Sequence, residues 1–198
     1  YPTDAPAVLL RNQLRQDFPT DEVLTVLFKG DQLFSRDFLG RLDKATAVLK
    51  ANALVDRVIT VATVEHISGS EDGFSVSPLV DMRNLAGKSP DAIRERVLAD
   101  RFAPGGLVSR DGRYMAMVVR PKPLDKTSER LELTVAVARA INDAGLRPFY
   151  AGEAGPVTMD VAQLESILSD TMRFVPLTVA IALALMFWVV GRVRPVVI

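Results

Sequence analysis

The chain carries few residues that could perform chemistry. His66 is the only histidine, and there is no cysteine at all. A metal centre needs several such ligands, and a hydrolytic triad needs a base paired with a nucleophile. Without cysteine, disulfides and thiolate nucleophiles are excluded. We therefore predict no catalytic residue, no metal site and no cofactor, and the sequence favours a protein that is not an enzyme.

The acidic residues are numerous but scattered. Glu71 and Asp72 lie among turn-forming residues, and three further acids are spread along a predicted helix: Asp160, Glu165 and Asp170. A solvated face accounts for this spacing better than a general acid/base pair. Residues 152–155 (Gly-Glu-Ala-Gly) precede a helix as a phosphate loop does, but they lack the Gly-Lys-Ser/Thr ending. We interpret them as a hinge.

The amino-acid composition limits the kinds of partner that the chain is expected to bind. The 198 residues include 24 Lys+Arg and 24 Asp+Glu, so the net charge is zero and no global field attracts nucleic acid. One Trp and three Tyr are too few for a base-stacking platform. Nucleic-acid binding is not expected.

A membrane span is predicted from Phe174 to Gly191. These residues contain no charge, and at 1.5 Å per residue they extend roughly 27 Å, close to the hydrocarbon thickness of a bilayer. Two arginines follow the run and one precedes it, which favours a cytoplasmic C-terminal side. Residues 195–198 (Pro-Val-Val-Ile) are typical of the start of a further apolar segment. An extracytoplasmic domain also needs targeting, so we expect a hydrophobic segment upstream of Tyr1.

The elements that must position any site follow from periodicity and caps. Residues 1–21 are a polar lead-in with a short helix predicted around 7–16. Ser35, Ser89-Pro90 and Gly145 are helix-capping signals. The predicted strands are 22–29, 58–65, 107–110, 114–120 and 147–151, and the predicted helices are 35–51, 89–101, 127–144 and one from 156 onward. Residues 68–74 are predicted to form a turn that opens an irregular stretch to about Lys88.

This order predicts a ferredoxin-like βαββαβ fold of the α+β class, followed by one transmembrane helix. The expected domain is 22–155, with an insertion at about 66–106 that carries a helix and a hairpin arm. Residues 156–191 form a long helix that enters the membrane, with the span at 174–191. Residues 192–198 form a cytoplasmic turn and the start of a further span.

Both faces of two strands are predicted to be apolar. In residues 23–28 and 114–118, each of the two alternating sets of side chains is mostly hydrophobic. The second face packs on a partner domain, lines a path for hydrophobic molecules, or is covered by residues 74–85 of the insertion. Six apolar residues are candidates for a substrate path: Phe74, Leu79, Met82, Phe102, Met115 and Met117.

Several short motifs resemble one family when taken in order. They are residues 18–22 (Phe-Pro-Thr-Asp-Glu), 54–58 (Leu-Val-Asp-Arg-Val), 107–112 (Leu-Val-Ser-Arg-Asp-Gly), 155–157 (Gly-Pro-Val) and 174–178 (Phe-Val-Pro-Leu-Thr). Together with the span, they resemble the first periplasmic loop and second transmembrane helix of resistance-nodulation-division (RND) transporters. The nearest branch is the mycobacterial-membrane-protein-large (MMPL) and hopanoid-transporter-like group.

The resemblance implies a proton-driven exporter of hydrophobic or lipid-like molecules in the bacterial inner membrane, with residues 1–172 periplasmic. This segment would be a porter-type subdomain that guides substrate, with Pro156 and Pro176 on the helix that transmits motion. The implied partners are a hydrophobic small molecule or lipid, the membrane, the remaining spans and second periplasmic loop, and periplasmic partner proteins. Proton-relay residues would lie in later spans, and the family includes trimers and monomers.

Two other functions remain open from the residues themselves. One is a binding or sensory ectodomain on a single membrane span. The other, a membrane-anchored hydrolase, has little support because His66 has no evident partner nucleophile.

Overall fold

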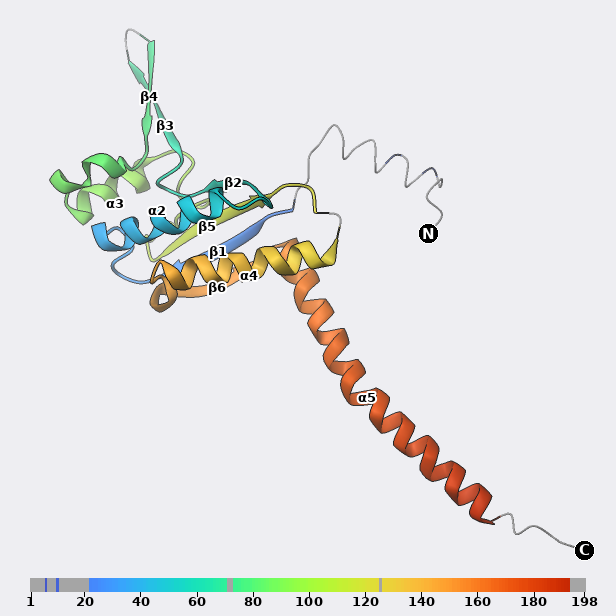
Figure 1. Ribbon diagram of the computed structural model, residues 1–198. Coiled ribbons are helices and arrows are strands. Elements are labelled where there is room, and N and C mark those ends of the chain that lie inside the picture. The colour runs from blue at the N-terminus through green and yellow to red at the C-terminus, as the bar shows by residue number, and fades with distance from the viewer. Residues whose placement is uncertain (1–5, 7–9, 11–21, 71–72, 125, 193–198) are drawn as a thin grey trace, which may run out of the picture. The chain divides into compact units, whose positions relative to one another are not determined.

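The computed structural model describes residues 6, 10, 22–70, 73–124 and 126–192 (Figure 1). It divides into two compact units, Tyr1–Met159 and Asp160–Ile198. The helix predicted around residues 7–16, the Glu71-Asp72 pair and the segment after Arg192 lie outside the described residues.

The first unit is an α+β arrangement built on a four-stranded antiparallel sheet. Its strands are β1 (Leu24–Lys29), β2 (Val55–Ile59), β5 (Tyr114–Pro121) and β6 (Tyr150–Ala154), in the order β2-β5-β1-β6. A separate antiparallel pair joins β3 (Glu65–Ser70) and β4 (Gly73–Pro78). The helices are α2 (Arg36–Lys50), α3 (Pro90–Ala99), α4 (Thr127–Asp143) and α5 (Pro156–Arg192), with short 3-10 segments η1 (Met82–Gly87) and η2 (Arg147–Phe149).

The predicted helix boundaries are largely confirmed by their caps. The Ser35 hydroxyl accepts from the backbone N–H of Phe38 at the start of α2, and Ser89 does the same for Ala92 at the start of α3. Gly145 follows α4 with a positive φ of 71°, which a glycine adopts without strain. Short polar side chains with local partners are therefore sufficient to fix these helix ends.

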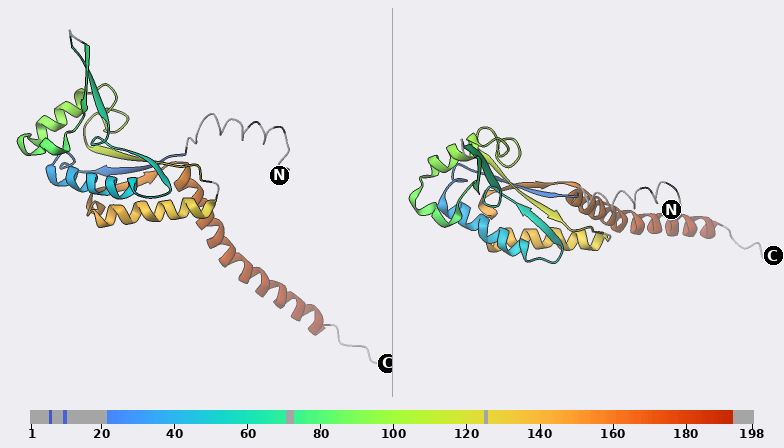
Figure 2. Two further views of the ribbon diagram at one scale, coloured as in Figure 1. Left: turned by 45° about the horizontal axis from the view of Figure 1, so that its top comes forward. Right: turned by 90° about the horizontal axis from the view of Figure 1, so that it is seen from above.

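Helices α2 and α4 lie side by side against one face of the sheet (Figure 2). The strand residues facing them are fully buried, among them Leu24, Val26 and Phe28 of β1. The Phe28 and Phe38 rings meet edge to face, with their centroids 5.7 Å apart, and Phe149 packs on Phe38 in the same manner at 5.0 Å. The hydrophobic core therefore lies between this face and the two helices.

The second predicted strand was placed too late in the chain. β2 ends at Ile59, because the next residues form a turn held by threonines: the Thr60 N–H donates to Thr63 Oγ1 at 2.8 Å, and the Thr63 N–H donates to the Thr60 carbonyl at 3.0 Å. Side-chain bonds of this kind compete with strand pairing. Residues 65–70 then start a second sheet instead of extending the first.

The insertion contains a hairpin arm, as predicted, but the arm lies in a stretch that was predicted to be a turn followed by irregular structure. β3 and β4 pair from Glu65–Pro78 to Ser70–Gly73, and they project away from the four-stranded sheet (Figures 1 and 2). The turn-forming residues mark only the tip of this arm. Residues 65–70 and 73–78 are rich in Gly and Ser and end on Pro78, a composition that is unusual for strands, so the sequence pattern missed them.

Two further strand boundaries differ from prediction. Residues 107–110 make single bridges through Val108, to Met115 and to Pro104, and form no strand. The last strand begins at Tyr150 because Pro148, which has no N–H to donate to a ladder, lies in the 3-10 segment η2.

The helix α5 runs over 37 residues from Pro156 to Arg192, as the sequence predicted. Within the described residues, Pro156–Trp188 is long and apolar enough to cross a membrane, with a mean hydropathy of 1.7 and no burial in its most apolar window. By length and composition, this helix is a candidate membrane span.

Candidate functional site

The sheet face turned away from α2 and α4 is the first candidate site, and we call it the open face. It is defined by the strand residues opposite the core in register: Arg57, Ile59, Tyr114, Ala116, Val118, Arg120, Thr25, Leu27, Lys29, Gly152 and Ala154. Its centre is apolar, with Leu27 opposite Ala116 and Ile59 opposite Val118. Leu27 is 36% exposed, whereas Ala116 is only 7% exposed.

A shallow hollow of about 190 Å³ opens on this face. Its lining combines Leu27, Tyr114 and Ala116 of the sheet with residues 105–109 of the incoming segment. That segment is held beside β5, because the Ala116 N–H donates to the Leu107 carbonyl at 2.7 Å. The polar Ser109 hydroxyl on the rim donates to Asp111 Oδ1 at 2.5 Å.

By register, the charged residues of the open face are Lys29, Arg57 and Arg120, and the β2 bulge adds one carboxylate, that of Asp56, beside Arg120. Lys29 and Arg57 are exposed, and Arg120 forms an ion pair with Asp56 of the β2 bulge at 3.1 Å. The Lys29 ammonium also lies 5.6 Å from the centroid of the Tyr114 ring. The face therefore combines an apolar centre with a basic rim at its two ends: Lys29 lies opposite Tyr114 at one end of β5, and Arg57 lies opposite Arg120 at the other.

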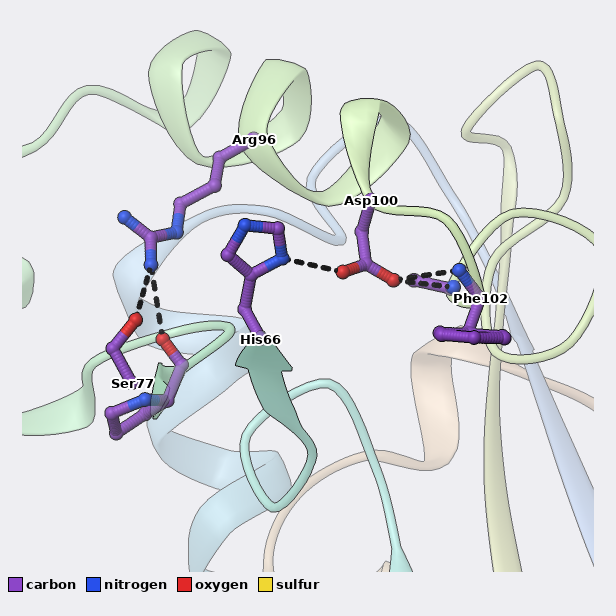
Figure 3. A network of polar contacts seen from close by, with 7 residues as sticks. His66, Ser77, Arg96, Asp100 and Phe102 are labelled. Carbon is purple, nitrogen blue, oxygen red and sulfur yellow. Dashed lines mark hydrogen bonds and ion pairs between the residues drawn. The ribbon is translucent and has the colours of Figure 1, made fainter. Parts of the chain in front are cut away.

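A polar network joins the hairpin to the end of α3 (Figure 3). The His66 Nδ1 of β3 lies 2.6 Å from Asp100 Oδ2, and the other Asp100 oxygen accepts from the backbone N–H groups of Phe102 and Ala103 at 2.8 and 2.9 Å. The Asp100 side chain is 5% exposed and that of His66 is 30% exposed. Burial raises the pKa of the Asp100 carboxyl, but the bonds from His66 and the two N–H groups outweigh it and hold this pKa below its usual value.

The network anchors the hairpin and has no catalytic arrangement. Ser77 lies directly across the hairpin from His66, but its hydroxyl accepts from Arg96 Nη2 at 3.2 Å, and the same nitrogen donates to the Pro78 carbonyl at 3.3 Å. A nucleophile in a triad is bonded to its base, and here the bonding partner of the serine is a cation. The sequence missed the partner of His66 because Asp100 lies 34 residues away.

The junction between β6 and α5 is closely packed. Gly155 has a φ of 132°, and a Cβ at this position would overlap the backbone carbonyl oxygen of Val23. The Gly155 carbonyl accepts from the Thr158 hydroxyl at 2.8 Å, and Val157 is fully buried. Next to it, burial raises the pKa of Glu153, and Arg147 partly opposes this shift. Residues 152–155, interpreted from the sequence as a hinge, thus form a closely packed connection to the first turn of α5.

The five predicted substrate-path residues whose side chains are described do not form one exposed surface. Leu79, Met115 and Met117 are fully buried in the core, so they contribute no exposed area. Phe102 is 74% exposed beside Asp100, and Met82 packs partly against the core. Phe74 lies in β4 opposite Gly69, and its side chain is outside the described structure. Met115 and Met117 look like surface candidates in the sequence only because both faces of β5 are apolar.

The predicted coupling prolines lie where they were expected along the chain. Pro156 begins α5, and Pro176 lies inside it, close to Thr178, whose hydroxyl donates to the Phe174 carbonyl at 2.8 Å. Such a back-bond is common in apolar helices. No group of three or more potential metal-ligating side chains converges in the part of the chain that the structure describes.

Comparison with protein-family models, with curated proteins and with solved structures finds no match to this chain. Its function must therefore be argued from its own geometry.

Proposed function

We propose that the chain is a periplasmic porter-type domain of a proton-driven RND exporter of the MMPL and hopanoid-transporter-like branch, with α5 as a transmembrane helix. The fold in this proposal is ferredoxin-like. The antiparallel strand order β2-β5-β1-β6 supports this fold, as does the position of the two helices, with α2 following β1 and α4 following β5. The exporter would lie in the bacterial inner membrane and move hydrophobic or lipid-like molecules.

One observation carries the proposal: the last strand of the sheet leads directly into the apolar helix. Only Gly155 separates β6 from Pro156, and the Gly155 carbonyl accepts a hydrogen bond from the Thr158 hydroxyl in the first turn of α5. A plain anchor is commonly joined to its domain by a flexible linker. The continuous connection suits a helix whose movement must reach the sheet.

A transport measurement tests this role. Everted membrane vesicles that contain the whole polypeptide would be given an imposed pH gradient, and movement of the hydrophobic dye N-phenyl-1-naphthylamine would be followed by fluorescence. We expect accumulation that a protonophore abolishes. Dye movement equal to that of vesicles lacking the protein, in the presence and absence of the gradient, would refute the export role and leave the single-span ectodomain as the alternative.

The orientation can be tested separately, because the chain has no native cysteine. A single thiol at exposed Val48 should react with a membrane-impermeant maleimide in intact spheroplasts, whereas one at Val193 should react only after permeabilisation. Equal labelling of both without permeabilisation would contradict a span between them.

A further inference from the structure

We propose that the open face binds an anionic single-chain amphiphile, such as a long-chain carboxylate, with its tail on the apolar centre and its head at the basic rim. This inference rests on the proposed export role in that it names the class of substrate.

The apolar part of the argument comes from the hollow. A volume of about 190 Å³ exceeds the roughly 150 Å³ of a cavity that accepts benzene, so it admits a segment of about six carbon atoms. Leu27, Ala116 and Tyr114 supply its sheet side. From there the cross-strand neighbours Val118 and Ile59 continue the apolar strip towards β2.

The charge on this face selects the head group. Among the strand positions of the open face, Lys29, Arg57 and Arg120 are basic and none is acidic. Arg120 is paired with Asp56, whereas the described ion pairs include neither Lys29 nor Arg57. Asp111, in the turn beside the hollow, is engaged by the Ser109 hydroxyl and the Arg113 N–H. A carboxylate head is therefore favoured over a neutral or cationic one.

A protein domain fits this face less well than a lipid. A standard protein interface buries about 800 Å² on each partner around an apolar core. Of the large hydrophobic residues on the open face, Leu27 has the greatest exposure, at 36%.

Binding is measured on the full chain in nanodiscs of phosphatidylcholine, with Thr25→Cys as the only thiol carrying an environment-sensitive fluorophore. The probes are dodecanoate and dodecanol, which share a tail and differ in head charge. We expect a saturable response to dodecanoate, at least tenfold weaker for dodecanol and weaker in 0.5 M salt. A reporter at Val48, exposed on α2, should not respond. A second reporter at Ala154, opposite Thr25, covers the case in which the first variant misfolds.

The charge requirement is tested with matched double variants. Lys29→Gln with Arg57→Gln should weaken dodecanoate binding about tenfold and leave dodecanol unchanged, because each exposed charge contributes modestly. Arg83→Gln with Arg139→Gln removes the same charge from η1 and α4, and should have no effect. Three results would overturn the inference. They are equal affinity for dodecanoate and dodecanol, equal weakening of binding by both double variants, and a reporter response that depends on protein concentration alone. The last result would indicate that a second copy of the chain covers this face.

The two proposals fail separately. Selective dodecanoate binding without gradient-driven dye movement would refute export and keep the binding site. Gradient-driven dye movement without selective dodecanoate binding would refute the binding site and keep the export role.

Discussion

Gly155→Ala is the sharpest test of the close packing at the junction between β6 and α5. The glycine has a φ of 132°, which L side chains rarely adopt, at a cost of about 1–2 kcal/mol. The added Cβ would overlap the Val23 carbonyl oxygen and lie 3.1 Å from its carbon, and forcing backbone apart costs about 1–3 kcal/mol more. We therefore expect a loss of about 2–5 kcal/mol, or on the order of 10 °C in the unfolding midpoint of a chain of this size.

The assay is thermal unfolding of the full chain in detergent, followed by circular dichroism and limited proteolysis. Gly40→Ala is the matched control, since Gly40 lies inside α2 with no atom within 4 Å of its added Cβ. That variant should gain about 0.5–1 kcal/mol. A midpoint for Gly155→Ala within 2 °C of the wild type would refute the reasoning, and so would equal losses in both variants. In the vesicle assay, Gly155→Ala should also slow gradient-driven dye movement.

Two further predictions separate core, surface and network residues. Asp100→Asn should destabilise by about 2–3 kcal/mol at neutral pH, because buried hydrogen bonds to a carboxylate are lost. The folded pKa of Asp100 is lowered, so its contribution is complete above the ordinary carboxyl pKa and disappears as the pH falls through the folded value. Unfolding midpoints between pH 7 and pH 3 should therefore fall less steeply in Asp100→Asn, and parallel curves would contradict this. Met117→Ala should lower the free energy of unfolding by about 2–5 kcal/mol, because the Met117 side chain is fully buried. Phe102→Ala should change it by less than about 0.5 kcal/mol, because the Phe102 side chain is 74% exposed. Denaturant titrations measure both values. Similar losses in both would mean that the assignment of core and surface is wrong.

Elements with local signals were predictable from the sequence. Ser35 and Ser89 cap their helices through bonds that span three residues, and Gly145 ends α4 within the same turn. The apolar run after Phe174 identified the C-terminal helix because charge is absent from every position. Each of these signals is contained in a few consecutive residues.

The open face was predictable only in part. Alternation in residues 23–28 showed that both faces of β1 are largely apolar, but it did not show which set would be buried. The choice depends on the register, since pairing Val26 with Met117 and Leu27 with Ala116 assigns the first pair to the helices. The basic rim combines Lys29 and Arg57 from strands that are separated in the chain by α2, and no local pattern could bring them together.

His66 illustrates the same limit in chemical terms. From the sequence, a lone histidine is interpreted as a structural or surface residue, but its partner cannot be named, because that partner is specified by how the β3–β4 arm packs against the end of α3. The structure gives it a buried carboxylate that also receives two backbone N–H groups, so one side chain closes α3 and holds the hairpin at once. Removing Asp100 should therefore loosen two elements together. Removing His66 leaves the Phe102 and Ala103 bonds in place and should weaken only the attachment of the arm, which Arg96 still holds through Ser77 and Pro78.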